Sequence, residues 1–145
     1  NLGEMPKPLS KIASGGELSR IILAIKSVIT SEKSAGTLIF DEVDTGVSGK
    51  TAQKIGEKLY KMTKSAQVIC ITHLAQIAAL ADKHFLIEKK TENVRTRTEI
   101  TPLDGNLRVN EIARIIGGEV ITDLTRENAK EQILLADKIK NKLKK

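Results

Sequence analysis

Apolar residues recur along this chain at two kinds of spacing, which separate predicted helices from predicted strands. Spacings of three and four run from Gly16 to about Glu32 and predict an amphipathic helix. The same spacing predicts four further helices, within residues 48–62, 74–81, 109–116 and 122–143. Two short apolar runs, residues 37–40 and 67–72, are instead typical of strands that are buried on both faces beneath helices.

A second pair of strands is predicted in the middle of the chain. Residues 84–88 and 97–101 are separated by the charged stretch 89–95, which predicts an antiparallel hairpin at a sheet edge. Residues 104–106 predict a turn, and residues 1–11 an extended lead-in. Helices that alternate with strands predict an α/β fold with a largely parallel sheet, flanked by helices and edged by this hairpin.

Length and composition limit the class of protein. The 145 residues are enough for one domain with a substantial core. A content of 40% apolar and 29% charged residues predicts a globular rather than a disordered chain. The chain begins with Asn1 rather than with a methionine, and we therefore expect it to be a fragment of a longer protein.

The net charge of +6 permits contact with DNA but is too diffuse to establish it. Residues 123–145 hold seven basic and four acidic side chains, so DNA contact by this helix competes with its interpretation as a solvated face. No apolar stretch approaches the roughly 20 residues that cross a bilayer. The single Cys70 lies in an apolar run and is expected to be buried without a disulfide. These features predict a cytoplasmic protein with no membrane partner.

A glycine-rich turn precedes the first predicted helix, in the run Ala13-Ser14-Gly15-Gly16-Glu17. A turn of this kind presents free N–H groups and the positive end of the helix dipole, which suit a phosphate. The spacing of Ser14 and Glu17 also matches a capping box, which explains both residues without a ligand.

Polar residues follow the two predicted buried strands. Asp41 and Glu42 end the first strand, where two acids suit a magnesium ion and a water molecule to be activated. Thr72 and His73 end the second strand. Taken singly, each feature also fits an ordinary strand that leaves the core, with its histidine satisfied by local hydrogen bonds.

Together these motifs resemble the ABC-type ATPase heads. Residues 13–17 look like the signature motif, residues 38–42 like Walker B, and residues 72–73 like the switch-histidine loop. Val43-Asp44 replaces the Pro-Thr that is usual in transporters and is similar to the SMC and Rad50 branch of chromosome-maintenance proteins. Residues 41–49 and 71–78 are similar to one bacterial DNA-repair family of that branch, which acts in double-strand break repair and recombination.

In such heads, ATP and Mg²⁺ lie between two heads, and the signature faces the nucleotide of the partner head. The resemblance implies that Ser14, Gly15, Gly16 and Glu17 form the ATP-binding part of this chain. The hydroxyl of Ser14 and the amides of Gly15 and Gly16 would hold the γ-phosphate. On this interpretation a side chain at Gly16 would block the phosphate, and the fold would tolerate it.

The resemblance also implies roles for the residues after the strands. Asp41 would position the magnesium ion, Glu42 would activate the attacking water as the catalytic base, and His73 would contact the γ-phosphate. Many related heads carry an aspartate where Ser48 stands here, which leaves the role of this loop and of Asp44 open. His84 has no comparable context and receives no role.

A second candidate phosphate loop spans residues 44–51, because it ends in Gly49-Lys50-Thr51 and approaches the pattern G-x-x-x-x-G-K-[ST]. It would make the chain a self-contained P-loop NTPase. However, Asp44 stands at the first glycine, where its carboxylate would repel a phosphate.

The ABC resemblance places the phosphate loop instead in an N-terminal lobe, beyond a coiled coil, so that this chain resembles the C-terminal lobe alone. The expected partners are that N-terminal lobe, a second head in a homodimer, and DNA near the nucleoid. We expect the chain alone to be inactive. A transporter head and a pure interaction module remain alternatives.

Overall fold

The computed structural model describes residue 5 and residues 8–29, 36–92 and 95–144. Most of the lead-in predicted for residues 1–11, and the predicted end of the first helix near Glu32, lie outside these residues. Where the lead-in is described, the prediction is wrong, because α1 (Leu9–Ile12) forms one helical turn.

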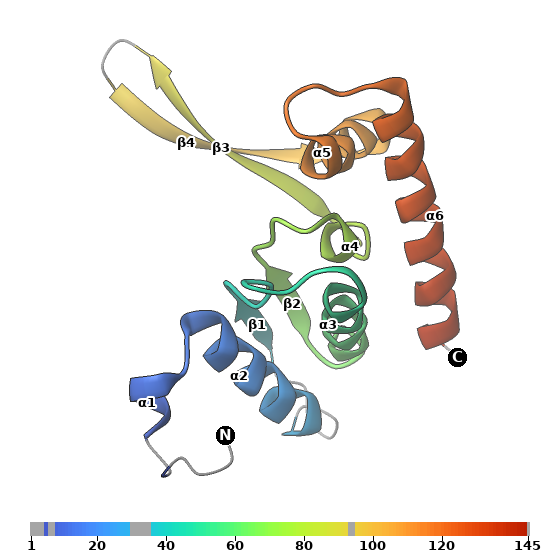
Figure 1. The fold of residues 1–145 in the computed structure, drawn as a ribbon. Helices are drawn as coiled ribbons and strands as arrows, with labels where there is room; N and C mark the ends of the chain where they lie inside the picture. The colour runs from blue at the N-terminus through green and yellow to red at the C-terminus, as the bar shows by residue number, and fades with distance from the viewer. Residues whose placement is uncertain (1–4, 6–7, 30–35, 93–94, 145) are drawn as a thin grey trace.

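A small parallel sheet lies at the centre of the first half of the chain (Figure 1). Strand β1 (Thr37–Phe40) pairs with β2 (Gln67–Cys70), and helix α3 (Gly49–Met62) connects them. One face of β1 is buried with the apolar face of α3, as the sequence predicts. The buried core of this half contains Leu23, Leu38, Phe40, Val43, Ile55, Leu59, Met62 and Ile77.

The opposite face of this sheet is not covered by the described part of the chain. Ile39 is 67% exposed, and Ile69 and Ile71 are also exposed. The prediction that both strands are buried on both faces is therefore wrong for this chain. Strand side chains alternate between two faces, and only one of those faces has a helix against it here. Strand β2 also ends at Cys70, two residues earlier than predicted.

Helix α2 (Gly15–Ile29) confirms the first predicted helix, but its apolar face is largely exposed. Among its residues only Gly16 and Leu23 are buried. The recurring apolar positions that predict the helix remain open to solvent, namely Ile21, Ile22, Ile25, Val28 and Ile29. The sequence pattern therefore reflects a surface that this chain alone does not bury.

The second half of the chain forms a helical layer. Helices α4 (Ala75–Ala78), α5 (Gly105–Gly117) and α6 (Asp123–Lys144) pack around small side chains. Alanines such as Ala113 and Ala129 are fully buried, which lets the helix backbones approach closely. The predicted turn at residues 104–106 is wrong, because α5 already begins there. None of the described helices is long and apolar enough to cross a membrane.

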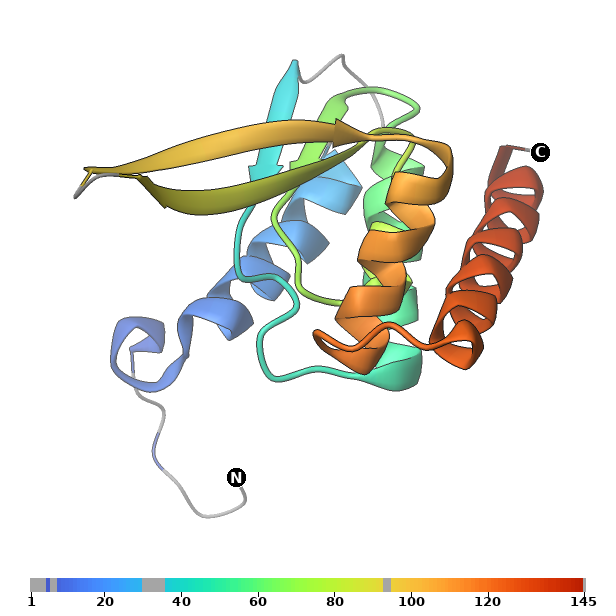
Figure 2. The same cartoon turned by 90° about the horizontal axis from the view of Figure 1, so that it is seen from above.

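Helix α6 is held to the rest of the chain by a buried cation (Figure 2 shows the helix beside α5). The Nζ atom of Lys140 lies 2.8 Å from Oδ1 of Asp82 and 5.5 Å from the ring centroid of Tyr60. Lys140 therefore contributes to packing, and it is not part of a solvated basic face.

The hairpin is confirmed and is longer than predicted. Strands β3 (His84–Glu92) and β4 (Arg95–Leu103) pair antiparallel in a sheet of their own that extends from the body (Figure 1). Part of the charged stretch predicted as a linker belongs to these strands. The Nζ atom of Lys90 lies 2.6 Å from Oε2 of Glu99, so opposite charges pair across the ladder.

Candidate functional site

The glycine-rich turn forms the N-terminus of α2 and contains a capping box. The backbone N–H of Ser14 donates to Oε2 of Glu17 at 2.8 Å, and its hydroxyl donates to the same oxygen at 2.9 Å. The N–H of Glu17 lies 3.3 Å from Oγ of Ser14. These hydrogen bonds from Ser14 lower the pKa of Glu17. The structure thus confirms the capping-box interpretation, while the Gly15 and Gly16 amides have no partner among the described residues.

This helix start packs directly against the loop that follows β1. The Ser19 hydroxyl donates to the carbonyl of Asp41 at 2.9 Å, and Arg20 donates to the carbonyl of Thr45 at 2.8 Å. A Cβ atom added at Gly16 would lie 2.9 Å from Cβ of Thr45 and 3.1 Å from its carbonyl oxygen. The expectation that the fold tolerates a side chain at Gly16 is therefore wrong.

Glu42 occupies an unusual backbone position immediately after Asp41. Its φ of 57° places it in the left-handed region, and it is the only non-glycine residue with positive φ in the described part of the chain. The left-handed backbone conformation is strained for a residue that carries a Cβ atom, and residues with such strain concentrate at functional sites. The exposed carboxylate of Glu42 lies beside Gly15, where an added Cβ atom would be 2.7 Å from Oε2.

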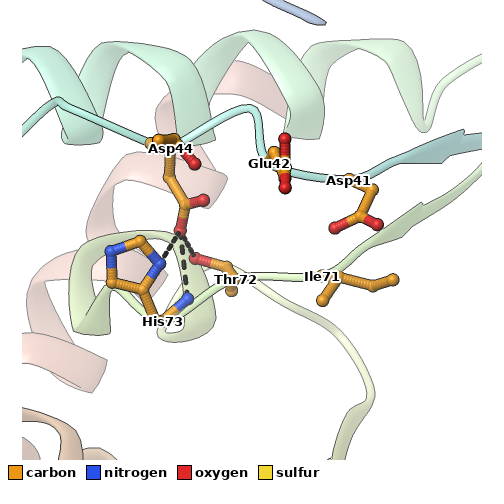
Figure 3. A pocket seen from close by; sticks show the side chains of 7 residues that line it. Asp41, Glu42, Asp44, Ile71, Thr72 and His73 are labelled. Carbon is orange, nitrogen blue, oxygen red and sulfur yellow. Dashed lines mark hydrogen bonds and ion pairs between the residues drawn. The ribbon is translucent and has the colours of Figure 1, made fainter. Parts of the chain in front are cut away.

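The loops that follow β1 and β2 together line a pocket of about 180 Å³ that is open to solvent. Figure 3 shows Asp44 of the first loop pointing toward Thr72 and His73 of the second, while Asp41 lies beside Ile71. The pocket lining consists of Asp41, Glu42, Asp44, Thr45, Ile71, Thr72 and His73. The sequence-predicted acids and histidine therefore meet in one place, at the carboxyl ends of two parallel strands, where open α/β sheets bind ligands.

Asp44 organises this pocket, and sequence reasoning left its role open. It is only 1% exposed. One of its oxygens, Oδ2, accepts hydrogen bonds from the hydroxyl of Thr72 at 2.5 Å and from the N–H of His73 at 3.0 Å. Nδ1 of His73 lies 3.3 Å from the same oxygen (Figure 3). The role of Asp44 could not be read from the local sequence, because its partners Thr72 and His73 lie in the loop after β2, far from it in the chain.

The second candidate phosphate loop does not form a phosphate cradle in this structure. The carboxylate of Asp44 points into the protein toward Thr72 and His73. The N–H of Val47 donates to the carbonyl of Asp44 at 3.3 Å, and the N–H of Thr45 donates to Glu42 at 3.1 Å. These two amides are thus used within the loop and are not available to a phosphate.

The acids of the pocket do not by themselves form a closed metal site. Among the described residues, no group of three or more histidine, cysteine, aspartate or glutamate side chains is arranged to hold a metal ion. Asp41 lies at the end of β1 and lines the pocket, so it fits one oxygen ligand of a magnesium ion whose other ligands come from elsewhere. His84 lies outside the pocket, and burial lowers the pKa of its imidazole.

Comparison with known proteins identifies the class of protein. A solved chain from work on ATP-driven dimerization and DNA-stimulated activation of SMC ATPases aligns with a TM-score of 0.53. The alignment covers 81% of this chain and 70% of that chain at 22% sequence identity. The fold of this chain is therefore similar to that of the solved chain. No protein-family profile matches the sequence.

The sequence comparison is more specific. DNA repair protein RecN of Bacillus subtilis is 53% identical over 140 residues, which is 97% of this chain. DNA repair protein RecN of Haemophilus influenzae is 52% identical over 134 residues. The chain therefore belongs with the RecN proteins, and it spans 24% of the length of these two relatives. This confirms the family resemblance that the strand-end motifs indicate.

Proposed function

We propose that residues 1–145 form the C-terminal lobe of a RecN-like ATPase head that acts in DNA double-strand break repair and recombination. The observation that carries this proposal is the pocket shared by Asp41, Glu42 and His73 at the ends of two parallel strands. A helix N-terminus with two unpartnered amides lies directly beside it. Carboxylates that hold magnesium or orient water, and free amides or an imidazole that stabilise phosphate charge, are groups that can support phosphoryl transfer from ATP.

Three of the residues that line the pocket have a proposed role in ATP hydrolysis. Asp41 contributes to binding of Mg²⁺, which neutralises charge on the phosphates when bound. Glu42 orients or deprotonates the attacking water, and its exposed carboxylate is accessible for this. His73 contacts the γ-phosphate through an imidazole that is 69% exposed.

The signature turn serves the ATP of a partner head in a homodimer. The amides of Gly15 and Gly16 bind the γ-phosphate, with the Ser14 hydroxyl beside them. Glu17 contributes by fixing the turn, because its carboxylate holds both the hydroxyl and the amide of Ser14. A phosphate would compete with Glu17 for that hydroxyl.

An N-terminal lobe is the proposed partner of the exposed apolar surfaces. The uncovered sheet face exposes Ile39 and Ile69, and the apolar face of α2 exposes several large apolar side chains. Adjoining exposed apolar side chains mark surfaces that other chain segments cover. The relatives are about four times as long, which provides ample chain to cover them. That lobe also supplies the phosphate loop. DNA is a further proposed partner, inferred from the similarity of this chain to the DNA repair proteins RecN. The proposed location is the nucleoid in the cytoplasm.

ATP turnover tests the proposal. The 145-residue chain alone should hydrolyse ATP negligibly, because no phosphate loop positions the nucleotide. A protein that joins this chain to its N-terminal lobe should be active, and it should lose activity in Glu42→Gln and in His73→Ala. Retained activity in both variants would contradict the proposed site.

A matched pair of lysine variants tests the alternative P-loop NTPase. Lys50 and Lys54 are both exposed on α3, but only Lys50 belongs to the G-K-T sequence. Lys50→Ala and Lys54→Ala should have equally small effects on ATP turnover. Activity of the isolated chain that is lost only in Lys50→Ala would establish the second phosphate loop and overturn the split head.

A further inference from the structure

The link between Asp44 and His73 carries an inference that rests on the proposed role of His73. Two hydrogen bonds and a 3.3 Å contact from Nδ1 of His73 converge on one oxygen of a carboxylate that is almost completely buried. Burying a carboxylate is costly unless it is paired and hydrogen-bonded, and here all the partners come from the loop after β2. The carboxylate therefore determines how that loop is arranged.

We propose that Asp44 is a positioning residue that fixes the His73 ring with its proton on Nδ1 and with Nε2 facing the open side of the pocket. Nδ1 lies 3.3 Å from Oδ2 of Asp44, and Figure 3 shows the second ring nitrogen on the far side of the ring. Which imidazole nitrogen carries the proton is set by the partner of the other nitrogen. Asp44 does not itself reach the nucleotide.

The neighbouring hydrogen bonds hold the ring in this position. The N–H of Leu74 donates to Oγ1 of Thr72 at 3.1 Å, and the Thr72 hydroxyl in turn donates to Asp44. The backbone N–H of His73 binds the same carboxylate, so backbone and ring have a common anchor. Such a network restricts both the loop and the ring, while the exposed side of the imidazole stays open to a ligand.

The protonated ring nitrogen can be observed directly, without ATP. The chain contains only two histidines, and His84→Gln assigns their ¹⁵N signals. At a pH where the imidazole is neutral, two-bond ¹H–¹⁵N spectra of the labelled chain should show His73 protonated on Nδ1. An unconstrained histidine carries this proton mainly on Nε2. A wild-type His73 protonated on Nε2 would overturn the proposal, and this result requires no variant to fold.

Three variants then identify the cause. Asp44→Ala should return the imidazole proton of His73 to Nε2. Asp44→Asn keeps an acceptor oxygen, so the imidazole proton should stay on Nδ1. Thr72→Val removes a different donor from the same oxygen, and His73 should still be protonated on Nδ1. An unchanged ring proton in Asp44→Ala would show that the aspartate only stabilises the loop.

ATP turnover in the two-lobed protein separates this inference from the proposed function. Asp44→Ala should lower kcat by roughly 10-fold or more while KM for ATP changes little, since misplacing a group costs rate more than binding. Adding Asp44→Ala to His73→Ala should cause no further loss, because Asp44 acts through the ring. If His73→Ala lowers kcat and Asp44→Ala does not, this inference alone fails. If neither lowers kcat, the role proposed for His73 fails with it.

Discussion

Gly15 and Glu42 lie in contact, although one opens a helix and the other follows a strand. A Cβ atom at Gly15 would be 2.7 Å from Oε2 of Glu42. The helix start that we assign to the partner's ATP is thus adjacent to the carboxylate that we assign to the chain's own ATP. Any displacement of α2 by a bound phosphate would be transmitted to Glu42 by direct contact.

The two glycines should differ in their tolerance of a side chain. Gly16→Ala should lower the free energy of unfolding by about 1–3 kcal/mol, because its Cβ would meet Thr45 and two backbone oxygens. Gly15→Ala should cost less, since the atom in its way is the movable end of Glu42. Urea unfolding of both variants measures this. Equal stabilities would contradict the close packing of α2 on the loop.

Loss of the Glu42 carboxylate should trap the ATP-bound state. In the two-lobed protein, Glu42→Gln should bind ATP and hydrolyse it roughly 10² times more slowly, the usual scale for a lost general base. The variant should accumulate as a dimer in size-exclusion chromatography with ATP. Glu57→Gln, at a partly exposed glutamate on α3 that does not line the pocket, is a suitable control. A Glu42→Gln protein that stays monomeric with ATP would rule out the closed dimer.

Mixed dimers should show that the signature acts across the interface. Gly15→Asp places a second carboxylate beside Glu42 and opposite any phosphate, so it should abolish hydrolysis. Mixing this head with one that lacks its phosphate-loop lysine should restore one complete site and part of the activity. The restored site uses Glu42 of the Gly15→Asp head, so Ser14→Asp heads mixed with the same partner are the control. If both mixtures form mixed dimers and remain inactive, the assignment of the signature turn to the partner's nucleotide is wrong.

The capping box should make α2 sensitive to acid. Hydrogen bonds from Ser14 lower the pKa of Glu17, so the ionised carboxylate stabilises the fold above the ordinary glutamate range, and this contribution is lost as the pH falls through the lowered pKa. The difference in unfolding free energy between wild type and Glu17→Gln should therefore shrink in acid. In a Ser14→Ala background the difference should already be small at neutral pH. A constant difference would exclude this linkage.

Cys70 should be unreactive in the native protein. Burial, with Asp44 and Asp41 nearby, raises the pKa of its thiol to about 12, so little thiolate forms at pH 8. Alkylation by iodoacetamide should be much slower than in denaturant. Because the folded pKa is raised, wild type should also lose stability relative to Cys70→Ala as the pH rises from about 9 toward 12. Fast native alkylation would contradict the burial.

The sequence predicts the elements well, because helix and strand spacings are local properties. The apolar positions of α3 are buried as expected, and the capping residues Ser14 and Glu17 bond as their spacing indicates. The exposure of Ile39 and of the apolar face of α2 could not be predicted in this way. Their apolar patterns are satisfied only if further chain covers them, and a local pattern does not say which chain does so.

The site is predicted in part for a similar reason. Asp41, Glu42 and His73 are recognisable because each follows a strand, and parallel strands bring their ends together. Asp44 and Gly16 could not be assigned, because their roles depend on close contacts between segments distant in sequence. The sequence pattern explains Gly16 by the approach of a phosphate, whereas in the structure the atoms nearest to an added Cβ belong to Thr45 and Glu42 of the same chain.

The left-handed backbone at Glu42 shows where this sequence departs from the most stable choice. A residue with a Cβ atom in this conformation costs on the order of 1–2 kcal/mol, which glycine would avoid. Selection for folding alone would favour glycine at this position. This sequence nonetheless carries a carboxylate there. A stabilising Glu42→Gly substitution would therefore remove the group on which activity is proposed to depend, so that at this position a gain in thermostability would come with a loss of activity.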